Sequence, residues 1–147
     1  LSAETVAAAA ETWHPDEPAD AVLLDAPCSA TGTIRRHPDV AWLKSPKDVA
    51  GLADVQSRLL GAAVNMVRPG GVIVYCVCSL QPEEGAERVR EFLATGAPVE
   101  RSAVQPSEIG GLDEMIDGRG ALQSLPFHLD DAGGVDGFHA VRLTRTE

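Results

Sequence analysis

Residues 21–32, "AVLLDAPCSATG", join a short apolar run to a turn that carries reactive side chains. The run Ala21–Leu24 is continuous, as expected of a strand that is buried on both faces of a parallel sheet. It stops at Asp25, and Pro27 and Cys28 follow at once. The strand therefore delivers a carboxylate and a thiol side by side onto one turn.

A second stretch repeats this arrangement. Residues 70–84, "GGVIVYCVCSLQPEE", run apolar from Val72 to Val77 and then reach Cys78. Between the two stretches, apolar residues from Pro46 to Val67 recur at steps of three and four, which predicts an amphipathic helix that the following "RPGG" ends. Strand, long helix and strand in this order are typical of a parallel α/β sheet.

The two cysteine turns are predicted to form one site. In parallel α/β sheets, right-handed crossovers leave the two strands close together, and ligands bind beyond their carboxyl ends. We therefore expect Asp25, Cys28 and Cys78 to face one crevice. Cys76 lies within the second strand, where a cysteine is usually a small buried hydrophobe, so we expect it to be inert to alkylation.

The remaining elements are predicted from local signals. Residues 1–13 favour a short strand around Glu4–Ala8 or a helix end, and residues 14–20 and 33–46 are expected to be largely loop. A second helix is expected to open at Pro82 and end at Gly96. The last expectations are a strand over 98–104, loops with short elements over 105–137, and a half-exposed strand over 138–144.

The bulk composition fits one soluble domain over residues 1–147. The chain is 44% hydrophobic, which is enough for a core at this length. No run approaches the ~20 apolar residues of a membrane span, and the start of the chain lacks a signal-peptide pattern. Three cysteines without such a signal argue against a disulfide framework, so we expect reduced thiols in the cytoplasm.

The charge opposes a simple nucleic-acid function. The net charge is −10, whereas phosphate binding depends on Lys and Arg. The only dense basic spot is "IRRHP" at 34–38. Its Arg35 and Arg36 are either part of a solvated loop or a local contact for a polyanion, and both readings stay open.

Two other functions of the cysteines, a metal centre and a thiol-redox role, fit the sequence less well. A metal centre would combine Cys28, His37, Cys76 and Cys78, but one residue between Cys76 and Cys78 does not match the two to four usual in zinc sites, so we expect no metal. A thiol-redox role for the same pair lacks the two intervening residues of the known motif.

Three segments together resemble the Sun/Fmu-type family of RNA cytosine-5 methyltransferases. "LLDAPCSATGTIRRHPDVAWL" (23–43) is similar to the family's Asp-Ala-Pro-Cys motif. "RPGGVIVYCVCSLQPEE" (68–84) is similar to its second cysteine motif, and "LPF…DGFHAVRL" (125–143) resembles its closing strand. The resemblance implies a Rossmann-like class I fold that depends on S-adenosylmethionine (SAM) and here apparently lacks its first strands.

The resemblance also implies a mechanism and site residues. The family adds a cysteine thiolate to carbon 6 of cytosine so that carbon 5 can attack the methyl group of SAM. By position, Cys78 is the nucleophile, Cys28 assists breakdown of the adduct, and Asp25 holds the edge of an unstacked cytosine. The substrate contacts implied in the first motif are Pro27, Ser29, Arg35 and Arg36.

The match to the family's cofactor site is only partial. The resemblance implies cofactor contacts from Asp25 and Pro27, and Glu11 is the acid nearest to Ala9, where the family tends to have one. A glycine-rich loop after a first strand is not recognisable, and Val77 replaces the usual threonine. We therefore interpret the chain as the C-terminal catalytic part of such an enzyme and expect it to bind SAM poorly by itself.

The partners follow from the same interpretation. We expect RNA, ribosomal RNA in particular, as substrate, and a possible homo-oligomer formed through an exposed sheet edge. The alternative function is a catalytically inactive, truncated methyltransferase-like module that serves as a binding or interaction domain.

Overall fold

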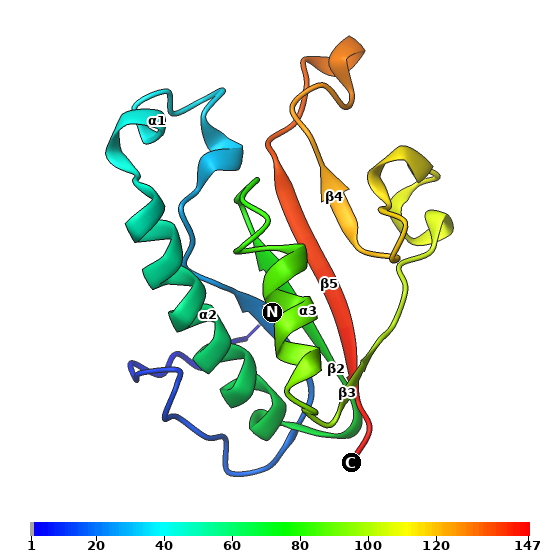
Figure 1. The fold of residues 1–147 in the computed structure, drawn as a ribbon. Coiled ribbons are helices and arrows are strands. Elements are labelled where there is room, and N and C mark those ends of the chain that lie inside the picture. Colours follow the sequence, from blue (N-terminus) through cyan, green and yellow to red (C-terminus); the bar gives the residue numbers. More distant parts are fainter. Residues whose placement is uncertain (1) are drawn as a thin grey trace.

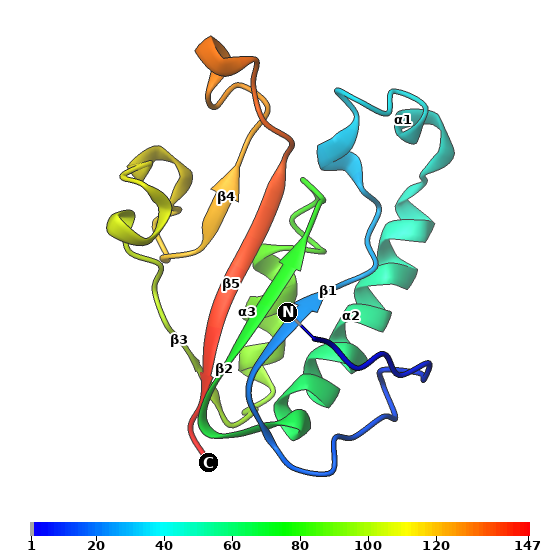
Figure 2. The same cartoon turned by 180° about the vertical axis from the view of Figure 1, so that it is seen from behind.

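A computed structural model describes residues 2–147 and contains a five-stranded sheet. The main strand order is β1–β2–β5–β3, and β4 also pairs with β5. Figures 1 and 2 show the two longer helices, α2 and α3, on one face of this sheet. The strands are β1 (Ala19–Asp25), β2 (Val67–Val77), β3 (Val99–Arg101), β4 (Leu122–Ser124) and β5 (Phe138–Arg145). The α-helices are α1 (Val40–Leu43), α2 (Pro46–Met66) and α3 (Ala86–Ala94).

The predicted strand–helix–strand unit is confirmed. β1 pairs with β2 in parallel, with Asp25 opposite Cys76, and α2 makes the crossover between them. A capping box starts α2, because the Ser45 N–H donates to Asp48 Oδ2 (2.9 Å) and the Asp48 N–H donates to Ser45 Oγ (3.4 Å). Pro46 occupies the first helical turn, where its missing N–H is not needed.

The core lies between the sheet and the two helices. It is built from apolar side chains that are nearly removed from solvent, and such burial contributes most of the folding free energy. The central members are Leu60, Val64, Ile73, Tyr75, Val77, Val89, Phe92, Val141 and Leu143. Among the described residues, no helix is both long and apolar enough to cross a lipid bilayer.

The last strand is more central than its alternating sequence predicts. β5 lies between β2 and β3 and is antiparallel to both. Val141 and Leu143 are buried and Arg142 and Thr144 are partly exposed, as the alternation predicts, whereas Ala140 is buried as well. The sheet is mixed as a result of the antiparallel pairing. The sequence did not predict this, because the alternating pattern of one strand does not indicate which strands it pairs with or in which direction.

Two further boundary predictions are wrong. α3 begins at Ala86, since residues 82–85 form turns and Gly85 has a non-helical backbone (φ −105°, ψ −110°). The proposed strand around Glu4–Ala8 is absent from the described chain, and residues 4–8 form no helix. No described strand pairs with that segment, and β1 pairs only with β2.

The remaining predictions hold in outline. β3 is shorter than the strand expected over 98–104, and 105–137 contains 3₁₀ turns and β4 as short elements. Residues 34–45 are loop apart from α1, while Thr33 ends a 3₁₀ turn and Pro46 begins α2. The free side of β1 forms an open sheet edge in the described structure (Figure 2). Leu23 on this strand is 73% exposed.

Candidate active site

The two cysteine turns meet at the end of the sheet, as the sequence predicts. The Sγ atoms of Cys28 and Cys78 lie 3.5 Å apart. The turns are joined by their backbones, because the Ala26 N–H donates to the Cys76 carbonyl and the Gly32 N–H to the Cys78 carbonyl, each at 3.0 Å. The thiols are therefore placed by hydrogen-bonded main chain.

The closing-strand segment, residues 125–143, packs against the same turns and is the third motif of the resemblance. The Gly137 N–H donates to the Gly32 carbonyl at 2.8 Å. A Cβ atom at Gly32 would lie 1.9 Å from the Gly137 oxygen, which leaves no room for any side chain. All three segments that resemble the family thus converge at one place.

A buried carboxylate lies beneath the thiols, and the sequence analysis missed it. Glu84 has no exposed surface. Its Oε1 accepts from the Ser29 N–H (2.9 Å) and Gln56 Nε2 (3.2 Å), and its Oε2 accepts from the hydroxyls of Ser29 and Ser79 (2.5 Å each). The sequence shows two adjacent acids after Pro82, and neither periodicity nor charge indicates which of them is buried.

The three cysteines differ in their surroundings. Burial raises the pKa of Cys28 to about 12, so this group keeps its proton at neutral pH. Burial also raises the pKa of Cys76 to about 11, and this residue is only 5% exposed. The prediction that Cys76 is buried is confirmed. Cys28 and Cys78 are half-buried.

Asp25 and Pro27 form the open side of the site. Both residues are exposed, and the Cys76 thiol approaches the Asp25 carboxylate only at a long distance, 3.8 Å from Sγ to Oδ1. An exposed carboxylate at the carboxyl end of a parallel strand is well placed to accept hydrogen bonds from a ligand.

Arg35 and Arg36 of the first motif form ion pairs with Asp136, which lies in a loop about 100 residues later in the sequence. Arg35 Nη1 lies 3.3 Å from Asp136 Oδ1, and Arg36 Nε donates to Asp136 Oδ2 at 2.8 Å. Arg35 also donates to the Gly133 carbonyl. The hydrogen bond from Arg36 lowers the pKa of Asp136. One carboxylate thus partly neutralises both charges, although Arg36 keeps 53% of its side chain exposed.

Two predicted ligand contacts are placed elsewhere. Ser29, for which a substrate contact was predicted, has no exposed surface in this structure, and its hydroxyl donates to Glu84 Oε2. Glu11 forms an ion pair with Arg58 on α2 (3.5 Å), and its carboxylate is thereby engaged by the protein.

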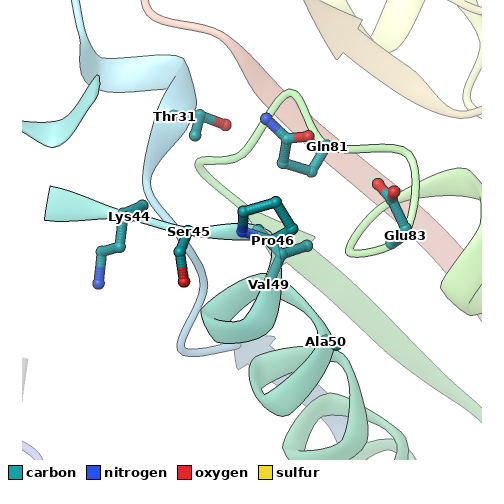
Figure 3. A pocket seen from close by; sticks show the side chains of 8 residues that line it. All are labelled: Thr31, Lys44, Ser45, Pro46, Val49, Ala50, Gln81 and Glu83. Atoms are coloured by element: carbon teal, nitrogen blue, oxygen red, sulfur yellow. The ribbon is translucent and has the colours of Figure 1, made fainter. Parts of the chain in front are cut away.

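A pocket of about 310 Å³ adjoins the cysteine turns, and the sequence did not predict it. It lies between the loop that follows Cys28 and the turn that follows Cys78 (Figure 3). Thr31 and Gln81 line it from these two turns, and the start of α2 closes another side. Thr31 also accepts from the Leu80 N–H at 3.0 Å, which joins the pocket wall to the Cys78 turn.

The mixed sheet fits a truncated Rossmann-like fold of the SAM-dependent methyltransferase class. The crystal structure of PH0851 superposes with a TM-score of 0.72 and 28% identity over 85% of this chain and 26% of that chain. The structure of NSun6 from Pyrococcus horikoshii with SFG has a TM-score of 0.65 and 23% identity over 85% of this chain and 29% of that one. The fold class predicted from sequence is therefore confirmed.

The sequence identifies the family. Residues 4–144 match the family model of the 16S rRNA methyltransferase RsmB/F, and the chain belongs to this family. Ribosomal RNA small subunit methyltransferase B of Cronobacter sakazakii is 38% identical over 135 residues, which cover 91% of this chain and 28% of that protein. The Klebsiella pneumoniae (MGH 78578) protein of the same name is 50% identical over 84 residues, 57% of this chain and 20% of that protein. The chain thus spans 20–28% of the length of these relatives.

Proposed function

We propose that this protein transfers a methyl group to carbon 5 of a cytosine in ribosomal RNA, with Cys78 as the covalent nucleophile. The observation that supports this most directly is the 3.5 Å separation of Cys28 Sγ and Cys78 Sγ beside the exposed Asp25. Two thiols at this distance are close enough to act on one pyrimidine ring.

The chemistry assigns different tasks to the two thiols. Cys78 sulfur forms a bond to carbon 6, which moves electron density to carbon 5 so that this carbon can take the methyl group. Loss of the carbon 5 proton to water then breaks the bond from carbon 6 to sulfur and restores the ring double bond. Cys28 retains its proton because burial raises its pKa, so it can donate a hydrogen bond to the attacking and the departing Cys78 sulfur.

The residues present fit part of a SAM site. Asp25 and Pro27 are exposed at the strand end beside the thiols and would hold the part of the cofactor that faces the base. SAM would supply the methyl group, on a positively charged sulfur. Glu11 forms an exposed ion pair with Arg58 (3.5 Å), which it would have to exchange for a contact to SAM.

The substrate is proposed from the family. An RNA cytosine must leave its stack to reach Cys78, and Arg35 and Arg36 are the exposed cations nearest in sequence to the first cysteine turn. We place the reaction in the cytoplasm, where a 16S rRNA substrate would be found.

The proposal is tested with the full-length product of the gene, labelled SAM and unmodified 16S rRNA. Cys78→Ala should lower methyl incorporation by about three orders of magnitude or more, because it removes the nucleophile. Cys28→Ala should accumulate an RNA–protein complex that survives denaturing electrophoresis, because release is impaired.

The matched control is Cys76→Ala, which alters a third thiol two residues from the nucleophile and should retain methyl transfer. Methyl transfer that persists in Cys78→Ala would overturn the proposed nucleophile. Binding of rRNA without any methyl transfer by the unmodified protein would favour the binding-module alternative.

A further inference from the structure

Glu84 contacts both cysteine turns at the residue that follows each thiol. Ser29 follows Cys28 and Ser79 follows Cys78, and both hydroxyls donate to Glu84 Oε2 at 2.5 Å. The two hydroxyls also lie 3.1 Å from each other. One carboxylate oxygen thus connects the two turns across 50 residues of sequence.

The other carboxylate oxygen of Glu84, Oε1, binds the Cys28 turn. Glu84 Oε1 accepts from the Ser29 N–H at 2.9 Å and from Gln56 Nε2 at 3.2 Å. Gln56 Nε2 also donates to the Pro27 carbonyl at 2.9 Å, and Gln56 is itself fully buried on α2. The backbone on both sides of Cys28 is therefore held by groups that meet at Glu84.

The hydroxyl groups around Glu84 form a consistent set of donors and acceptors, while Gln56 Oε1 is buried without a hydrogen-bond partner among the described residues. Ser79 Oγ accepts from the Gln81 N–H at 3.0 Å, so its own proton is free to go to Glu84. The Tyr75 hydroxyl donates to the Glu84 carbonyl and anchors the main chain of this residue to β2. A buried carboxylate that accepts four hydrogen bonds from rigid donors is strongly fixed in position.

We propose that Glu84 is the positioning residue that holds the Cys28 and Cys78 thiols at their working separation. This inference rests on the proposed function, in which both thiols act on one base. Glu84 lies beneath the thiols, fully buried, and acts through Ser29 and Ser79. A displacement of about 1 Å in a catalytic group can lower a rate roughly a hundredfold, so such a support matters for the rate.

The test measures the thiol separation without requiring methyl transfer. An aromatic disulfide reagent first forms a mixed disulfide at one exposed thiol and releases one coloured thiolate. The second cysteine, as thiolate, then attacks that sulfur, which forms the Cys28–Cys78 disulfide and releases a second coloured thiolate. The second release therefore reports how well the two sulfurs face each other, and peptide mass mapping identifies the pair.

Glu84→Gln should slow the second release about tenfold or more, with the first release changed less than about twofold. The amide keeps the size of the side chain but turns an NH₂ donor toward groups that also donate. Glu87→Gln is the matched control, because Glu87 is a neighbouring, partly exposed acid that pairs with Arg90, and it should behave as the unmodified protein.

Ser29→Ala and Ser79→Ala cover the case in which Glu84→Gln does not fold. Each removes one hydroxyl donor and should slow the second release by a smaller factor. Unchanged second release in folded Glu84→Gln, or in both serine variants, overturns the inference.

The same variants separate this inference from the proposed function. In the full-length product, Glu84→Gln should lower kcat with KM for RNA changed less than about twofold, since no substrate contact is removed. Slow disulfide closure together with no methyl transfer by the unmodified protein would refute the proposed function and leave the positioning role standing.

Discussion

Cys28 Sγ and Cys78 Sγ lie 3.5 Å apart at the exits of two adjacent parallel strands, although 50 residues separate them in sequence. The separation depends on backbone hydrogen bonds between the turns and on the buried Glu84 cluster.

The first prediction concerns thiol ionisation and stability. The pKa of Cys28 rises from 9.0 in its ordinary state to about 12 in the folded chain, chiefly through burial. The stability that this shift contributes is fully present below about pH 9 and is lost as the pH rises toward about 12. Chemical denaturation at a series of pH values should therefore show a steeper alkaline loss of stability for the unmodified chain than for Cys28→Ala.

The comparison with Cys28→Ala is needed because Cys76 and Tyr75 have raised pKa values as well. Most of their contribution is common to both proteins and cancels in the difference, because burial and Glu84 raise the pKa of Tyr75 more than Cys28 does. Identical alkaline slopes for the two proteins would show that the Cys28 thiol is not buried as described.

The second prediction concerns the close approach of two glycines. Gly32→Ala should destabilise the fold by roughly 3 kcal/mol or more, because its Cβ would lie 1.9 Å from the Gly137 carbonyl oxygen. The loss should appear as a lower denaturation midpoint in urea with an unchanged slope.

Gly51→Ala is the matched control. Gly51 lies exposed within α2, and an added Cβ meets nothing within 4 Å. This substitution should stabilise the chain by about 0.5–1 kcal/mol, since alanine favours the helix. A tolerated Gly32→Ala would mean that the first and third motifs do not touch.

The third prediction concerns the arginine pair and RNA. Arg36→Ala should weaken binding to a 16S rRNA fragment and reduce the salt slope of the binding constant by about 1, as expected for one lost phosphate contact. Filter binding across a salt series measures both quantities. Arg90→Ala on α3, a similarly exposed arginine, should change neither.

Asp136→Asn tests the same contact from the other side. It removes the charge that engages Arg35 and Arg36, so both should become more available and RNA binding should strengthen. Weaker RNA binding by Asp136→Asn would instead indicate that the ion pairs shape the loop that RNA needs.

The fourth prediction concerns the open edge of β1. Unpaired strand edges with exposed apolar side chains favour association, and Leu23 is 73% exposed there. We expect the isolated chain to associate as its concentration rises, in light scattering after size-exclusion chromatography. Leu23→Lys should shift it toward the monomer, as charged residues do at sheet edges.

Leu43→Lys provides the control for that experiment. Leu43 is 69% exposed but lies on α1, away from the sheet edge. An unmodified chain that stays monomeric at every concentration tested would contradict the predicted oligomer.

The sequence by itself determined the β1–α2–β2 unit and the meeting of its two cysteine turns. These features depend on short-range signals, namely two apolar runs and one helical periodicity, and on the fixed handedness of the crossover. The two cysteine motifs and the closing-strand segment together indicated the family by resemblance. The match over residues 4–144 confirms that family.

Only the tertiary structure decided which polar groups serve the site. It buried Glu84 and Ser29, paired Arg35 and Arg36 with Asp136, and inserted β5 antiparallel beside β2. These contacts join residues from 55 positions apart, as in Ser29 and Glu84, to 101 positions apart, as in Arg35 and Asp136, so no local pattern contains them. A polar side chain is buried where partners from several elements satisfy its hydrogen bonds, and the fold alone brings those partners together.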